Sequence, residues 1–115
     1  MKTEITESEA KKILGQDVFF MEGIFLSTEC YMAAKRENKR VVHGVVSYST
    51  EDKNVQLIAQ YQFVRDYHEF VFTKYILTDD VSVYTEIVEW IKSITKETEE
   101  KKPRQEYRGL NFTNE

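Results

Sequence analysis

The side chains that could do acid–base or nucleophilic chemistry in this sequence are few and scattered. His43 and His68 each fall in a segment expected to be a strand, and Asp66 precedes His68 by two residues. A general base needs a partner within hydrogen-bond reach and a cleft to work in. Asp66 and His68 would share a side only if the strand already begins at Asp66, so the sequence favours an exposed polar strand end over a catalytic pair.

Cys30 and the two histidines give no metal or nucleophile pattern either. Successive members of this set are separated by 13 and 25 residues, which matches no zinc-binding spacing. No neighbouring residues single out Cys30 as a nucleophile, and a buried free cysteine is common in protein cores. The four glycines are isolated, so no phosphate-binding loop is expected. We therefore predict no catalytic, metal or cofactor site, and a protein that is not an enzyme.

Side chains suited to protein recognition are more numerous. The sequence holds seven tyrosines, a residue type enriched at protein interfaces, and most fall on predicted strands, where half-burial in the sheet is the alternative explanation. The glutamine-bearing face of one strand is polar but uncharged, so a partner could cover it without burying charge. The last helix adds an acidic outer surface. We predict a partner-binding set of Tyr48, Gln60, Gln62, Tyr67, Tyr75, Glu86 and Glu89.

Two basic clusters raise nucleic-acid binding as a weaker possibility. One surrounds a predicted turn, and the other lies in the last fifteen residues beside Tyr107. Basic groups next to aromatic rings are typical of single-strand binding proteins. The net charge of −4 and the acidic excess of residues 79–100 oppose attraction to a polyanion, so we predict that nucleic acid is not the partner. The clusters are Lys35, Arg36, Lys39 and Arg40, and Lys101, Lys102, Arg104 and Arg108.

The stretch from Val41 to Thr95 must position most of these side chains. It predicts three consecutive strands, at residues 41–49, 55–63 and 67–77, followed by an amphipathic helix. The second strand alternates clearly, whereas the third carries large apolar residues on both faces and should be central or covered on its second side. We expect the helix to lie across the apolar face of the meander. That face carries Val55, Leu57, Ala59, Tyr61 and Phe63, and the helix stripe is Val81, Tyr84, Ile87, Val88, Ile91 and Ile94.

The N-terminal part is less regular. Thr6 and Glu9 form a capping box for a short helix that should end at Gly15. Residues 17–26 (DVFFMEGIFL) are nearly continuously apolar, which predicts a buried strand bent at Gly23. Residues 27–38 fit a helix about as well as a strand, with a slight preference for a strand that turns back at residues 36–39.

Length and composition indicate one α+β domain over residues 1–100 and a polar tail or arm over 101–115. With 41% apolar residues among 115, the chain can build a core. The predicted fold is a four- or five-stranded antiparallel meander with a short N-terminal helix and a long C-terminal amphipathic helix packed on one face. One cysteine, a polar N-terminus and no apolar run of about 20 residues predict a cytoplasmic protein without a membrane span.

These observations lead to a functional prediction. We expect a small acidic, non-enzymatic, protein-binding module of the inhibitor, immunity or accessory-subunit type, acting through its sheet face and the acidic helix surface. The alternative is a self-assembling structural subunit, a homo-oligomer that uses an edge strand and the C-terminal arm.

Overall fold

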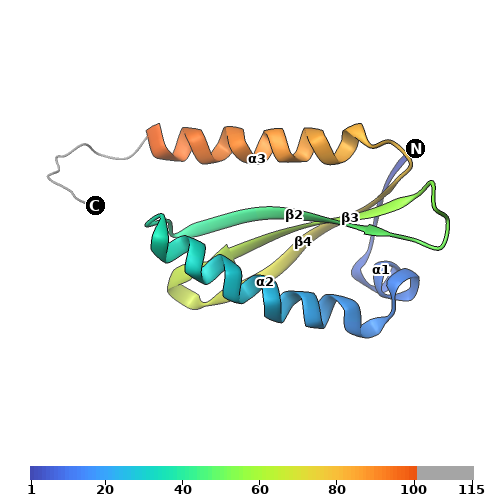
Figure 1. Ribbon diagram of the computed structural model, residues 1–115, viewed down its shortest axis with the longest axis horizontal. Coiled ribbons are helices and arrows are strands. Elements are labelled where there is room, and N and C mark those ends of the chain that lie inside the picture. Colours follow the sequence, from blue (N-terminus) through green and yellow to red (C-terminus); the bar gives the residue numbers. More distant parts are fainter. Residues whose placement is uncertain (101–115) are drawn as a thin grey trace, which may run out of the picture.

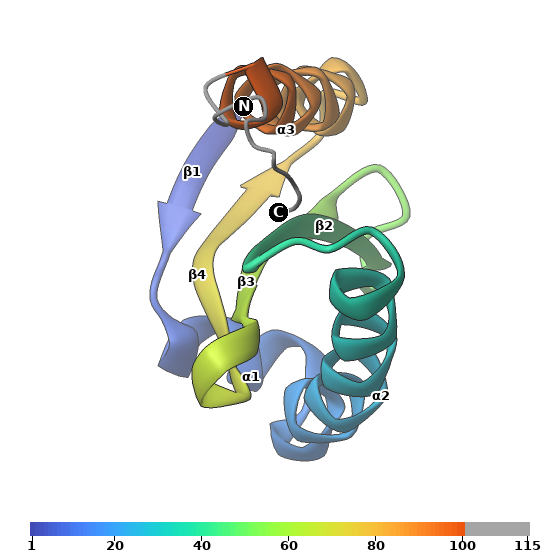
Figure 2. The same cartoon turned by 90° about the vertical axis from the view of Figure 1, so that its left-hand side faces the viewer.

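The computed structural model describes the backbone of residues 1–100 and the side chains of residues 1–94. It is an α+β fold with an antiparallel sheet between two helical layers, as Figures 1 and 2 show. Helices α1 and α2 cover one face of the sheet, and α3 lies over the other (Figure 2). The predicted class and four-stranded antiparallel sheet are confirmed. The elements are β1 (Lys2–Ile5), α1 (Glu7–Leu14), α2 (Gln16–Arg36), β2 (Val41–Ser49), β3 (Gln56–Val64), a 3-10 turn (Arg65–Tyr67), β4 (Glu69–Thr78) and α3 (Ser82–Glu100).

The sheet has the strand order β1-β4-β3-β2, so β4 is central, as its apolar composition predicted. Strands β2, β3 and β4 form the expected meander. Strand β1 was not predicted, because its sequence KTEI is short and polar. It pairs antiparallel with the end of β4, from Lys2 opposite Thr78 to Ile5 opposite Tyr75. A short, charged strand is a usual way to end a sheet.

The first helix follows its sequence signals closely. The Thr6 side chain accepts a hydrogen bond from the backbone N–H of Glu9, and the Glu9 carboxylate accepts one from the backbone N–H of Thr6. The predicted capping box is therefore confirmed. Gly15 ends α1 with φ at 99°, a conformation that favours glycine.

The prediction for the next segment is wrong. Residues 17–26, expected to be a strand, and residues 27–38, with a slight preference for strand, together form helix α2. Gly23 lies inside this helix and does not bend a strand. The buried side chains of α2 are spaced by seven, four and four residues, which is a helical face. They are Phe19, Leu26, Cys30 and Ala34.

A β-bulge explains why β4 appeared apolar on both faces. Gln60 of β3 is opposite Lys74, whereas the next residue, Tyr61, is opposite Phe72, so Thr73 is an extra residue in β4. A bulge of this kind reverses the alternation along a strand. Residues 70 and 72 before the bulge and residues 75 and 77 after it therefore share the face covered by α1 and α2.

The C-terminal helix packs on the opposite face from the one predicted. The buried side chains of Leu57, Ala59 and Phe63 lie with residues of α1 and α2. Helix α3 instead contacts Ile58 and Ile76 through Val83. The long apolar helix α2, mistaken for a strand, occupies the more apolar face, and α3 covers the other. Val81, assigned to the helix stripe, precedes α3 and is 75% exposed.

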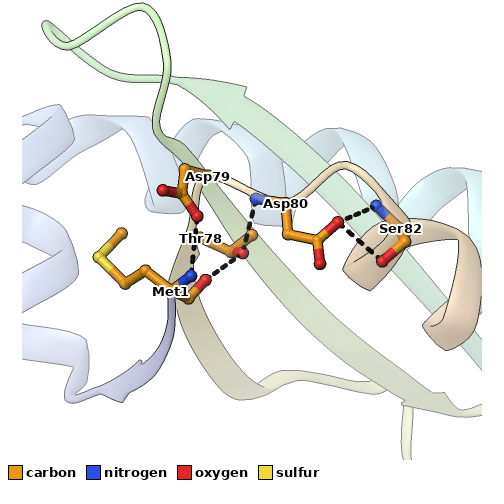
Figure 3. A network of polar contacts seen from close by, with 5 residues as sticks. All are labelled: Met1, Thr78, Asp79, Asp80 and Ser82. Carbon is orange, nitrogen blue, oxygen red and sulfur yellow. Dashed lines mark hydrogen bonds and ion pairs between the residues drawn. The ribbon is translucent and has the colours of Figure 1, made fainter.

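A polar network fixes the junction between β4 and α3 (Figure 3). The buried hydroxyl of Thr78 donates to the carbonyl of Met1 at 2.5 Å and accepts from the backbone N–H of Asp80 at 3.0 Å. Asp80 in turn accepts hydrogen bonds from the backbone N–H and hydroxyl of Ser82, the first residue of α3. The Met1 amino group pairs with Asp79 at 2.9 Å. Asp80 thus caps the start of α3.

The predicted tail, residues 101–115, lies outside the described residues, and the prediction of a long C-terminal helix concerns residues beyond Ile94 whose side chains are not described.

Candidate protein-interaction face

The potential catalytic side chains do not come together in the structure. Asp66 accepts two hydrogen bonds from the guanidinium of Arg40, at 3.2 and 2.7 Å, and this pairing lowers its pKa. His68 instead lies against aromatic rings, 4.4 Å from Tyr31 and 6.2 Å from Phe63 between centroids. His43 is on the opposite face of the sheet, beside α3, where partial burial lowers its pKa. Neither histidine is hydrogen-bonded to a carboxylate in the described part of the chain.

Cys30 is a core residue. Its side chain is buried with Ala34 and Phe63, and burial raises the pKa of the thiol to about 11. A nucleophilic cysteine needs a lowered pKa, so the surroundings of Cys30 oppose that role. Among residues 1–94, no group of three or more metal-ligating side chains is close enough to hold an ion.

Two carboxylates pair with three members of the first basic cluster. Glu37 pairs with Arg36 at 3.2 Å and with Lys39 at 3.0 Å, and Asp66 pairs with Arg40. Lys35 has its ammonium group 5.5 Å from the Tyr31 ring. The cluster is therefore partly, not fully, neutralised. The second basic cluster falls among residues outside the described chain.

The predicted partner-binding residues are distributed over several surfaces. Tyr75 is 7% exposed and packs against Phe19 in the core. Tyr48 is half-buried, with its hydroxyl donating to Glu22 at 3.1 Å. Tyr67 is 79% exposed at the end of the sheet.

The remaining members of the set lie near α3. Gln60 and Glu86 meet in a groove of about 430 Å³ between α3 and strands β1 and β4. Lys2, Glu4, Lys74 and Trp90 also line this groove, so it carries charges of both signs. Gln62 is half-buried beside it, and Glu89 is exposed and 3.7 Å from Lys92. The structure thus brings Gln60 and Glu86 together but does not join the set into one surface.

A group of exposed apolar side chains lies elsewhere, on the side of α2 that faces away from the sheet. We call it the α2 face. Its five large apolar side chains are each more than half exposed, and they recur at helical spacing, so they form one stripe. They are Phe20 (68%), Met21 (62%), Ile24 (54%), Phe25 (60%) and Met32 (58%).

The α2 face was not predicted from the sequence, because residues 17–26 were expected to form a buried strand. The signal was present in the same residues. A helix that is apolar on all sides is normally buried on all sides, yet here only the side of Phe19 and Leu26 meets the sheet.

Comparison of the chain with protein-family models, with curated proteins and with solved structures finds no match. In the part of the chain that the structure describes, the helices lack the length and apolar character that a membrane crossing requires.

Proposed function

We propose that this chain is a non-enzymatic protein-binding module of the inhibitor, immunity or accessory-subunit type, and that it binds through the α2 face. The observation that carries the proposal is the exposure of Phe20, Met21, Ile24, Phe25 and Met32 on one side of one helix. Single exposed apolar residues are ordinary on protein surfaces, but contiguous patches mark interaction sites.

The composition of the α2 face supports a protein as the ligand. Phenylalanine and methionine are enriched at protein–protein interfaces, and charged residues are depleted from interface centres. Between Phe20 and Met32 the exposed positions are apolar except for Thr28 and Glu29, and Glu29 lies at the edge of the stripe. The flexible methionines can adapt to an irregular partner surface.

The proposal differs from the sequence-based one in the surface it uses. The glutamine-bearing sheet face predicted to bind lies on the side of α3, whereas Tyr48 and Tyr75 belong to the core on the other side. The acidic outer side of α3, with Glu86 and Glu89, remains available as a second contact. The proposal also places the module in the cytoplasm, which the single unpaired cysteine, Cys30, supports.

The test is affinity capture from cells that make the protein, comparing the natural chain with Met21→Glu/Phe25→Glu. Both side chains point away from the core, so the variant should fold, and circular dichroism with a thermal melt checks this. We expect the natural chain to retain a specific protein that the variant does not. The control is Ser8→Glu/Asn54→Glu, which adds the same charge to exposed positions outside α2 and α3 and should retain it. Equal capture by all three chains would refute the α2 face as the binding surface.

A further inference from the structure

We propose that the partner of the α2 face is a second copy of this chain, docked with its α2 helix antiparallel to the first about a two-fold axis beside residue 26. This inference rests on the proposed function, because it assumes that the α2 face binds protein. Three features of the helix support it: the area of the face, its symmetric arrangement about residue 26, and the charges at its two ends.

The area is close to what a stable dimer requires. Two phenylalanines, two methionines and one isoleucine, each more than half exposed, present roughly 600 Å² of apolar surface if each contributes about 120 Å². A standard specific interface buries about 800 Å² on each partner. The polar residues that border the stripe supply the remainder as a rim, so the face can form one side of a dimer by itself.

The order of residues along α2 is suited to pairing with itself. In a two-fold interface, if residue i of one copy contacts residue j of the other, then j of the first contacts i of the second. With the axis beside residue 26, Phe20 lies opposite Met32 and Ile24 lies opposite Thr28. Asp17 then lies opposite Lys35. Positions 17, 21, 24 and 28 follow the alternating spacing of four and three residues that two packed helices share.

The charges at the ends of the face select the antiparallel direction. Asp17 is in the first turn of α2 and Lys35 in the last, and by helical spacing both project on the side of Met21 and Ile24. An antiparallel pair places each acid against a base, whereas a parallel pair places acid against acid and base against base. The dipoles of the two helices are also better matched when antiparallel.

Neither of the two end charges, Asp17 and Lys35, has an ion-pair partner within the described residues of one copy. Among residues 1–94, Asp17 and Lys35 form no ion pair with another side chain, although Arg36, Lys39 and Arg40 beside Lys35 each do. The ammonium group of Lys35 lies over the face of the Tyr31 ring, 5.5 Å from its centroid, and not beside a carboxylate of the described residues. The dimer gives both groups a partner at the rim of an apolar contact, where complementary charges fix register and orientation.

The experiment measures the mass of the full chain in solution by light scattering and sedimentation, up to about 200 µM. We expect twice the monomer mass of 13.7 kDa. Asp17→Lys and Lys35→Asp should each raise the dissociation constant roughly tenfold or more, and the double variant should bring it back toward the natural value. Glu51→Lys, the same charge change in the loop after β2, is the matched control and should leave the dissociation constant unchanged.

Several results would overturn the inference. A monomer throughout the concentration range would do so, as would a dimer indifferent to both charge reversals. A chain truncated after residue 100 that dimerises while the full chain stays monomeric would show that residues 101–115 cover the face instead.

The outcomes for the dimer and for the proposed function can be told apart. A monomeric chain whose capture of another protein is abolished by Met21→Glu/Phe25→Glu refutes the dimer and leaves the proposed function standing. If that variant changes neither the mass nor the captured protein, both proposals fail. Circular dichroism confirms that every variant in the comparison is folded.

Discussion

At the scale of single residues, the closest packing between strands β2 and β3 depends on one missing side chain. Gly44 lies opposite Tyr61 in the sheet, and the Tyr61 ring occupies the space where a Cβ of residue 44 would be. The ring also lies 5.2 Å from that of Phe70 between centroids, so it has little freedom to move away. The role of Gly44 is therefore steric, and it allows a large ring to cover a bare stretch of backbone.

We predict that Gly44→Ala destabilises the fold by about 1–3 kcal/mol, because the added methyl group forces the Tyr61 ring out of its position. Urea unfolding followed by circular dichroism measures the change. Gly23→Ala is the matched control. A Cβ there would meet Phe70 at an ordinary 3.7 Å, and alanine inside helix α2 should add up to about 1 kcal/mol. Equal effects of the two substitutions would contradict this account of Gly44.

At the scale of elements, the junction of β4 and α3 depends on the hydroxyl of Thr78. This hydroxyl donates a hydrogen bond to the carbonyl of Met1 and accepts one from the N–H of Asp80. The residue is 1% exposed. Both hydrogen bonds are partly buried, and losing the hydroxyl removes the partner of one backbone acceptor and one backbone donor. The network therefore joins β1, β4 and α3 in one place (Figure 3).

Thr78→Val removes the hydroxyl and keeps the shape of the side chain, and we expect it to cost about 1–3 kcal/mol of stability. Thermal and urea unfolding give the value, and hydrogen exchange should show faster opening of β1 and the start of α3. Thr73→Val is the control, since the exposed Thr73 hydroxyl makes a longer hydrogen bond, 3.4 Å, to the carbonyl of Gln60. If Thr78→Val lowers the free energy of unfolding no more than Thr73→Val does, the network does not contribute to stability in the way we propose.

The elements also show where sequence reasoning succeeded and why it failed elsewhere. Helix α1 and the hairpin of β2 and β3 could be read from local signals, a capping box and a clear alternation. Helix α2 could not be predicted from local signals. Its outward side is as apolar as its inward side, so the hydrophobic pattern of its sequence lacks the helical period of 3.6 residues. The reversal of alternation in β4 at Thr73 could not be predicted, since a bulge leaves no mark in the composition. Sequence rules tend to fail at functional sites, and α2 is the element through which we propose that the chain binds.

At the scale of the whole molecule, the predicted class and sheet were right, but the distribution of the layers was not. Placing α3 depended on knowing what covered the other face, and that information lay in the misread segment. The candidate site shared this error. The predicted set was chosen from tyrosines and glutamines on the sheet, and the structure places Tyr75 in the core while exposing Phe20 and Phe25 on α2. Binding residues can be predicted correctly only if the faces of the sheet and helices that point to solvent are assigned correctly first.

The layer between the sheet and helices α1 and α2 holds four groups that ionise at high pH and whose pKa is raised by burial. Burial raises the pKa of Tyr61 and Tyr75 to about 12 and that of the Cys30 thiol to about 11. The pKa of Tyr48 is raised as well, by burial and by the nearby Glu22 carboxylate. All four groups are neutral when protonated. In the folded state they therefore keep their protons to a higher pH than in the unfolded chain.

The sign of the pH effect follows from this difference. Below about pH 8 both states are protonated and stability does not depend on these groups. The unfolded chain then loses the thiol proton from about pH 8.5 and the tyrosine protons from about pH 10, so it is favoured as the pH rises. We predict that the free energy of unfolding stays level from about pH 7 to 8, begins to fall near about pH 9 and falls more steeply from about pH 10 to 12. Urea unfolding at a series of pH values, with tyrosinate absorbance recorded in parallel, measures both quantities on one sample.

Tyr75→Phe isolates one contribution. The Tyr75 hydroxyl has no hydrogen-bond partner in the described part of the chain, and its ring packs in the core against Phe19, so phenylalanine should fit with little loss at neutral pH. This variant should lose less stability than the natural chain as the pH rises from about 9 to 12, because one group with a raised pKa is gone. Tyr67→Phe, at a residue that is 79% exposed, should follow the natural curve. If Tyr75→Phe falls as steeply as the natural chain, the alkaline loss arises outside this layer, and the tight closure of α2 over the sheet is not what raises these pKa values.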